Sequence, residues 1–267
     1  VIADSIELVS FAERFDGLVT VGGCDKNMPG TMMAIARLNL PAIFLYGGTI
    51  MPGRVGNKSV SIQDVFEGVG AHSKGLMTSE ELLDLECGAC PGAGSCGGLF
   101  TANTMSSAIE AMGMSLPGVA SIPAVDPRRL EVAHQSGLMS LKTLREGIRP
   151  RDILNRKAFE NAITVVLAMG GSTNAVLHLL AIAHEAEVDL SLKDFDRISQ
   201  NTPYIADMKP GGQYLMADLD KIGGLSLVMK RLLDAGLLHG DALTITGESI
   251  EHTLKDINDT GDESIVH

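Results

Sequence analysis

The feature that most constrains the fold is a pair of near-continuous apolar runs separated by one helix-length segment. The runs are "GLVTVGG" (17–23) and "PAIFLYGG" (41–48), and the segment between them is "PGTMMAIARLN". This order predicts a βαβ unit with a buried parallel sheet. Because ligands gather at the carboxyl ends of parallel strands, we expect the turns at Cys24–Lys26 and Gly47–Thr49 to lie at one functional edge.

The rest of the chain is expected to be mainly helical. Helical spacing of apolar residues predicts helices at about 127–146, 157–169, 173–186, 192–200 and 217–236. The expected class is therefore α/β, a layered parallel-sheet domain with helices on both faces and a largely helical second half. We assign residues 1–240 to the main part of this domain, truncated at its start. Residues 241–267 are either the end of that domain or a lead-in to another one.

Composition excludes several classes of partner. The chain has 21 basic and 33 acidic residues, a net charge of −12, no block of Lys or Arg, and no Trp. Such a chain is a poor candidate for binding nucleic acid or an anionic membrane. No apolar run approaches the roughly 20 residues that span a bilayer. Four cysteines are few for a disulfide scaffold, so we expect a reducing compartment, the cytoplasm or an organelle matrix.

The tripeptide Cys24-Asp25-Lys26 places a soft ligand beside a hard one. Thiolates favour soft metals and iron–sulfur clusters, whereas carboxylates favour Mg²⁺, Ca²⁺ or Mn²⁺. Neighbouring side chains on a loop can therefore point at two different ions. The alternative is a buried structural cysteine followed by a surface Asp-Lys turn. The flanking strand and glycines weaken that alternative without eliminating it.

A second candidate site is the glycine-rich stretch "ECGACPGAGSCGG" (86–98). Its Cys87 and Cys90 form a C-x-x-C pair, which is compatible with redox chemistry or with zinc. A zinc knuckle would need a second close pair, but the remaining Cys24 and Cys96 lie far apart in the sequence. The formal G-x-G-x-x-G match at 92–97 lacks the preceding strand of a dinucleotide site. We interpret its glycines as backbone that passes close to an inorganic group, with Cys96 as a ligand.

Other polar residues have simpler explanations. His178 and His184 lie in an apolar helical segment but six positions apart, so they occupy different faces, and His178 is interpreted as a core residue. Thr101, Asn103 and Thr104 follow the Cys96 loop at a helix start, where capping would explain them.

Three segments together resemble a known family: "GGCDKNMPGTMMAIARLNLPAIFLYGGT", "CPGAGSCGGLFTANTMSSAIEAMGMSLPG" and "AFENAITVVLAMGGSTNAVLHLLAIAHEA". They are similar to the dihydroxy-acid dehydratases of branched-chain amino-acid (isoleucine and valine) synthesis. These enzymes belong to a wider family with 6-phosphogluconate and sugar-acid dehydratases. The resemblance covers essentially the whole chain, and the C-P-G-A-G-S-C-G-G form favours the dihydroxy-acid branch.

The resemblance implies roles for four residues. Cys24 and Cys96 would ligate an iron–sulfur cluster, either 2Fe-2S or 4Fe-4S. Asp25 would bind Mg²⁺, and Lys26 would do so as N6-carboxylysine, which converts an amine into an anionic oxygen ligand. Carbamylation needs a deprotonated amine, a state that burial would favour. Cys87 is not carried over, and the role of Cys90 stays open.

The resemblance also implies that this chain is incomplete. A third cluster cysteine and another Mg²⁺-binding carboxylate would precede Val1. A further Mg²⁺-binding Glu and the Ser that serves as general base would belong to an absent C-terminal β-barrel domain. No catalytic base is therefore assigned within residues 1–267, and the chain alone is expected to be inactive.

The reaction implied is dehydration of a 2,3-dihydroxy acid, a small-molecule substrate, to a 2-keto acid, carried out by a homodimer. Two alternatives stay open. One is a sugar-acid dehydratase of the same family, and the other is a non-enzymatic zinc or redox module built on Cys87 and Cys90.

Overall fold

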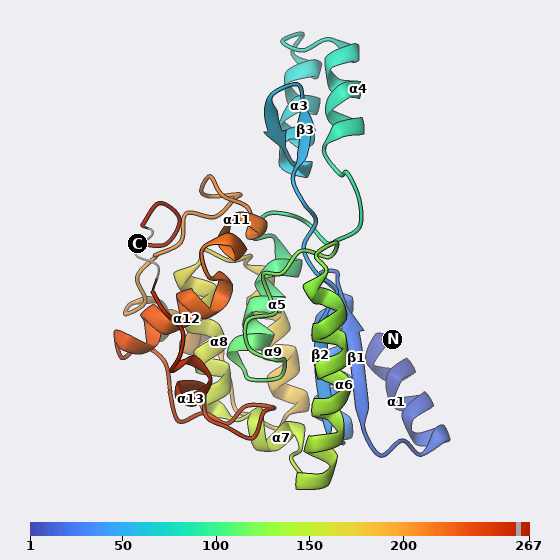
Figure 1. The fold of residues 1–267 in the computed structure, drawn as a ribbon, viewed down its shortest axis with the longest axis vertical. Helices are drawn as coiled ribbons and strands as arrows, with labels where there is room; N and C mark the ends of the chain where they lie inside the picture. Colours follow the sequence, from blue (N-terminus) through green and yellow to red (C-terminus); the bar gives the residue numbers. More distant parts are fainter. Residues whose placement is uncertain (260–262) are drawn as a thin grey trace.

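The computed structural model describes residues 1–259 and 263–267 (Figure 1). A compact body carries a protruding arm, drawn at the top of Figure 1. In chain order the elements are α1 (Ile2–Glu13), β1 (Leu18–Gly22), α2 (Asn27–Leu38), β2 (Ala42–Tyr46), β3 (Gly53–Val55), β4 (Lys58–Val60), α3 (Ile62–Ser73), α4 (Ser79–Gly88), α5 (Thr101–Ala111), α6 (Arg128–Glu146), α7 (Pro150–Ile153), α8 (Arg156–Ala168), α9 (Asn174–Glu185), α10 (Leu192–Ser199), α11 (Met216–Lys221), α12 (Gly224–Asp234) and α13 (Ile250–Leu254).

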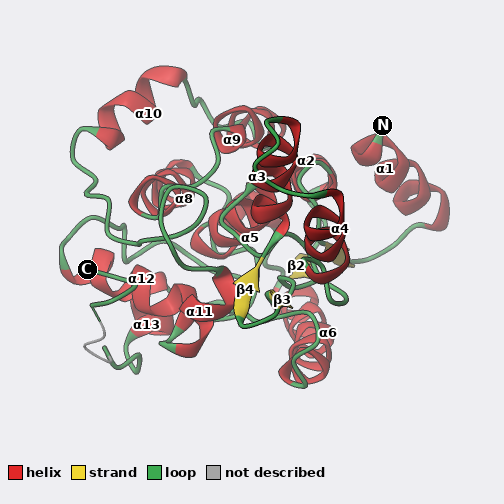
Figure 2. Ribbon diagram, turned by 90° about the horizontal axis from the view of Figure 1, so that it is seen from above, coloured by secondary structure: helices red, strands yellow, loops and turns green. Residues whose placement is uncertain are grey.

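The expected βαβ unit is confirmed. Strands β1 and β2 pair in parallel, with a register that runs from Leu18 opposite Ala42 to Gly22 opposite Tyr46, and α2 is the crossover. Figure 2 shows α2 and α6 on opposite sides of this pair, as predicted. The expected burial of the strands is confirmed for β2 but is wrong for β1, whose Val19 and Val21 are exposed. The parallel sheet has only these two strands among the residues described.

The centre of the body is α5. Every residue of this helix is buried. Its sequence, "TANTMSSAIEA", is rich in small side chains, which let α8, α2 and α9 approach closely. Met105 and Ile109 of α5 pack in one cluster with Phe44 of β2. The helix that follows the glycine-rich loop is therefore the best-packed element near the predicted site.

The helical second half matches expectation except at one point. Four predicted helices appear as α6, α8, α9 and α10, and a capping box formed by Ser191 and Asp194 starts α10. The helix expected at 217–236 is wrong as a single element, since it divides into α11 and α12. The break occurs at Gly223 and Gly224, which have φ angles of 123° and 66°. A Cβ at Gly224 would also lie 2.3 Å from Ser121 Oγ, so the glycine permits a close approach.

The arm consists of the antiparallel β3–β4 hairpin and the packed pair α3 and α4. Its polypeptide leaves the body after β2 and returns through the glycine-rich loop (Figure 1). Within the described part of the chain, no helix is both long enough and apolar enough to cross a bilayer.

Candidate active-site corner

The loops that follow β1 and β2 meet the glycine-rich loop at the carboxyl ends of the strands. Gly47 N donates to Gly22 O at 2.8 Å, which joins the first two loops. Ser95 N donates to Gly48 O at 2.9 Å, and Ile50 N donates to Ser95 O at 2.7 Å. These two hydrogen bonds pair the Cys96 loop with the chain leaving β2. The expectation that the two turns lie at one edge is therefore confirmed, and the glycine-rich loop joins them there, whereas the ligand-binding role of this edge stays a prediction.

Gly94 is required by this pairing. Its φ is +134°, and a Cβ would lie 2.5 Å from the backbone of Ile50. The close protein backbone is sufficient to explain Gly94, while the interpretation that this loop passes close to an inorganic group stays a prediction. At Gly92 a Cβ would meet nothing within 4 Å.

The buried side chain of Asn103 holds the Cys96 loop in place through hydrogen bonds. Its fully buried Nδ2 donates to Cys96 O at 2.6 Å and to Gly98 O at 2.7 Å. Its Oδ1 accepts from the hydroxyl of Tyr46 at 2.7 Å, and burial raises the pKa of Tyr46, which keeps that hydroxyl a donor. The expected capping role is wrong, because Phe100 is the N-cap of α5 and no side chain caps it. Asn103 instead joins β2 to the Cys96 loop.

Thr101 and Thr104 are not caps either. Thr104 Oγ1 accepts from Ser172 N at 2.9 Å, and Thr101 Oγ1 accepts from Asn174 Nδ2 at 2.9 Å. Both threonines therefore attach the "GGSTN" turn, which starts α9, to the side of α5. The second and third sequence segments that carried the family resemblance therefore meet at this turn, and the first joins them through the contact between Tyr46 and Asn103.

The Cys24-Asp25-Lys26 turn is closed by one side chain. Asn27 Oδ1 accepts from Gly23 N at 3.2 Å and from Cys24 N at 3.1 Å. Cys24 is exposed, which removes the alternative of a buried structural cysteine. The side chains of Asp25 and Lys26 are 42% and 60% exposed, with Lys26 Nζ 3.8 Å from Asp25 Oδ2. Burial, which would favour a deprotonated Lys26, is therefore absent at this side chain within the described residues.

Cys24 and Cys96 interact electrostatically. The thiol of Cys96 lies against a cavity wall, and this partial burial raises its pKa, with smaller contributions from the charges of Cys24, Cys90 and Asp25. The two predicted cluster ligands therefore lie close enough for the charge of Cys24 to affect the pKa of Cys96. Cys90 belongs to the same group of thiols.

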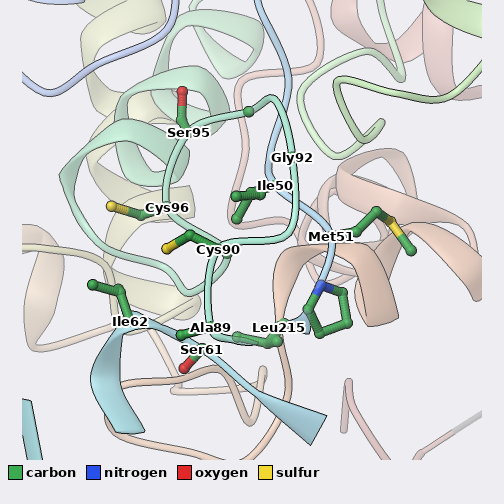
Figure 3. A pocket seen from close by; sticks show the side chains of 13 residues that line it. Ile50, Met51, Ser61, Ile62, Ala89, Cys90, Gly92, Ser95, Cys96 and Leu215 are labelled. Carbon is green, nitrogen blue, oxygen red and sulfur yellow. The ribbon is translucent and has the colours of Figure 1, made fainter. Parts of the chain in front are cut away.

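A cavity of about 260 Å³ adjoins Cys96 (Figure 3). Figure 3 shows the side chains of Cys90 and Cys96 pointing to one side of the loop, while Ser95 points away. Much of the remaining lining is apolar, namely Ile50, Met51, Pro52, Ile62 and Leu215. The cavity thus has two thiols, a soft type of ligand, along one edge and apolar side chains along much of its remaining wall.

His178 is the site residue that sequence reasoning missed. It is buried on α9, as expected, but its Nε2 lies 3.4 Å from Lys26 Nζ. Burial lowers the pKa of His178, the nearby Lys26 charge lowers it further, and Asp25 partly opposes this shift. His184 is exposed, which confirms that the two histidines occupy different faces. The sequence did contain a signal for this site residue. It is a histidine in the first turns of an otherwise apolar helix, directly after the polar "GGSTN" turn.

The donor set at this corner consists of exposed thiols, one carboxylate and one lysine. Within residues 1–259 and 263–267, no three His, Cys, Asp or Glu side chains are arranged to hold a metal ion. The predicted ligands Cys24 and Cys96 and the predicted ligands Asp25 and Lys26 therefore lie at this corner as a thiol pair and a carboxylate–lysine pair.

Comparison with known proteins identifies the family. Residues 1–253 match the family model described as dihydroxy-acid/6-phosphogluconate dehydratase, N-terminal. The chain belongs to this family. The dehydratase resemblance inferred from the three segments is thereby confirmed.

Within the dehydratase family, the curated relatives that the chain matches are named dihydroxy-acid dehydratases. The chain is 58% identical to dihydroxy-acid dehydratase 2 of Staphylococcus saprophyticus, with 100% of the chain aligned to 47% of that protein. It is 56% identical to the dihydroxy-acid dehydratase of Acidothermus cellulolyticus, covering 100% of the chain and 48% of that protein. For the enzyme of the same name from Sulfurisphaera tokodaii the identity is 56%, over 96% of the chain and 46% of the relative. The chain therefore spans about half the length of the curated relatives it matches.

Proposed function

We propose that this chain is part of a dihydroxy-acid dehydratase that converts 2,3-dihydroxy acids to 2-keto acids in isoleucine and valine synthesis. The observation that carries the proposal is the meeting of a soft pair, Cys24 and Cys96, with a hard pair, Asp25 and Lys26, at one strand edge. Curated relatives at 56–58% identity are named dihydroxy-acid dehydratases. Two metals of different character could bind adjacent oxygens of one small substrate at such an edge.

The residues present fit the groups that the family implies. Cys24 and Cys96 are exposed thiols on neighbouring loops, which suits an iron–sulfur cluster. Asp25 and a carbamylated Lys26 would hold Mg²⁺ through oxygen. When bound, the cluster supplies Lewis acidity toward the departing 3-hydroxyl, and Mg²⁺ lowers the pKa of the C2 proton.

The chain's own residues orient these ligands. Asn103 and the Ser95 pairing fix the backbone on which Cys96 is carried. Lys26 is the N-cap of α2, where the helix dipole favours an anion such as a carbamate. The apolar cavity wall beside Cys96 would keep water away from groups bound there. The remaining ligands and the general base are expected from polypeptide outside residues 1–267.

Metal analysis after anaerobic purification of the full-length protein tests the proposal. We expect iron and inorganic sulfide, with visible absorbance that is lost in Cys24→Ala and in Cys96→Ala. Cys87→Ala is the matched control, because Cys87 is also an exposed free cysteine but has no assigned role. A colourless protein with one zinc per chain would overturn the proposal in favour of the zinc or redox module.

A substrate panel separates the two enzymatic alternatives. The full-length protein is expected to dehydrate short branched 2,3-dihydroxy acids faster than sugar acids. The reverse preference would assign it to the sugar-acid branch. Residues 1–267 alone are expected to have no measurable turnover, and turnover by this chain would refute the need for outside ligands.

We infer that the enzyme acts in the cytoplasm, or in an organelle matrix in a eukaryote, and that it is a homodimer. Light scattering coupled to size exclusion on the full-length protein tests the second point. A monomeric mass at micromolar concentration would contradict it.

A further inference from the structure

The side chain of Lys26 has few fixed partners. It is largely exposed, and its Nζ contacts Asp25 Oδ2 at 3.8 Å and His178 Nε2 at 3.4 Å. A free lysine side chain carries nearly 2 kcal/mol of rotamer entropy, so an exposed lysine samples many positions. Because Asp25 is itself half-exposed, the contact with His178 is the one that, among the described residues, joins the side chain of Lys26 to a buried part of the fold.

His178 is held firmly. It is 8% exposed and lies on α9 between the buried residues Ala175 and Leu179. The start of α9 is attached to α5 through the hydrogen bonds from Asn174 to Thr101 and from Ser172 to Thr104. One buried helix, α5, therefore positions both the Cys96 loop and, through α9, the ring that contacts Lys26.

The chemistry of the contact suits both forms of the lysine. A neutral imidazole that carries its proton on Nδ1 can accept a hydrogen bond at Nε2. Lysine Nζ donates as an ammonium, and after carbamylation the nitrogen still keeps one N–H. The same ring atom can therefore hold Nζ in place before and after modification.

We propose that His178 is a positioning residue, which fixes Lys26 Nζ at the metal-binding corner by accepting a hydrogen bond from it. The proposal rests on the proposed function for the role of Lys26. It predicts that loss of the acceptor reduces carbamate formation on Lys26 without disturbing the rest of the fold. It also predicts weaker Mg²⁺ binding.

The test uses the full-length dehydratase equilibrated with ¹³C-bicarbonate, with the carbamate measured by ¹³C NMR. In His178→Ala and His178→Leu the Lys26 carbamate and the affinity for Mg²⁺ are expected to fall about tenfold, as for other residues that orient metal ligands. His178→Gln, whose Oε1 can replace Nε2 as the acceptor, should restore most of the signal. His184→Ala, on an exposed face of the same helix, should leave it unchanged.

A second measurement keeps the proposal testable if a His178 variant fails to fold. In protein labelled with ¹⁵N-histidine, the Nε2 shift of His178 should indicate an acceptor and should move in Lys26→Met, a change at an exposed position. An unchanged Nε2 shift, or full carbamate in His178→Leu, would overturn the proposal. Absence of carbamate in the wild type would remove Lys26 from the proposed metal ligands, while the Nε2 shift would still decide the contact.

Discussion

The two loops that carry the predicted cluster ligands are built differently. The Cys96 loop is fixed by a buried amide, by backbone pairing with the chain after β2, and by a glycine against Ile50. The Cys24 turn is closed by the side chain of Asn27 and by a hydrogen bond from Met28 N to Cys24 O, and it leaves Cys24 and Lys26 exposed and Asp25 half-exposed. One half of the corner is rigid within this chain, and the other half is open.

This difference matters for how each half can be disrupted. Unsatisfied polar groups cost most where water cannot replace the lost partner, so changes beneath the Cys96 loop should reduce the stability of the whole fold. Changes at the Cys24 turn leave groups that water can reach. They should act locally and have small effects on the free energy of unfolding.

The largest effect is expected for Asn103→Ala. This change removes the donor to Cys96 O and Gly98 O and removes the Asn103 acceptor of the buried Tyr46 hydroxyl. We expect the free energy of unfolding to fall by about 3 kcal/mol, measured by urea denaturation. Asn201→Ala, at an exposed position with a single 3.3 Å bond to Arg197 O, is the control and should cost less than about 0.5 kcal/mol. Equal costs in the two variants would show that the Cys96 loop is not anchored as described.

An intermediate effect is expected for Gly94→Ala. The added Cβ would meet the Ile50 backbone at 2.5 Å with φ at +134°, so we expect a loss of about 2 kcal/mol in urea denaturation. The neighbouring Gly92→Ala meets nothing within 4 Å and should change stability by less than about 0.5 kcal/mol. If both variants were equally stable, the pairing between the Cys96 loop and Ile50 would be too loose to position a ligand.

Much of the fold could be predicted from sequence because it depends on local patterns. Alternation of apolar runs and helical spacing predicted the β1–α2–β2 unit and four later helices. The break between α11 and α12 was missed, although the Gly223-Gly224 pair was visible, because helical periodicity continues across it. Local sequence patterns thus predicted most helices and strands. The error at α11 and α12 lies where the backbone conformation of two glycines interrupts a helix although the helical periodicity continues.

The site was only partly predictable. Cys24, Asp25, Lys26 and Cys96 were identified from motifs, and their roles as ligands stay predictions. The capping role expected for Asn103 is wrong, and the core position expected for His178 is confirmed but does not include its contact with Lys26. Their contacts, with Tyr46 and with Lys26, join positions 57 and 152 apart in the chain. No periodicity or spacing rule reports such contacts, because packing of α5 and α9 creates them.

The smallest effect is expected for Asn27→Ala, and it tests the open half of the corner. The variant frees the N–H groups of Gly23 and Cys24, but both are accessible to water, so the cost in urea denaturation should stay below about 1 kcal/mol. Hydrogen exchange should report the change instead, with faster exchange at Gly23 and Cys24 and no change at Cys96. Asn57→Ala, in the exposed β3–β4 turn, serves as the control. A loss of stability as large as that of Asn103→Ala would contradict this difference between the two loops. Water can replace the lost hydrogen bonds of an exposed turn, so a loss this large would mean that the Cys24 turn supports the fold as much as the Cys96 loop does.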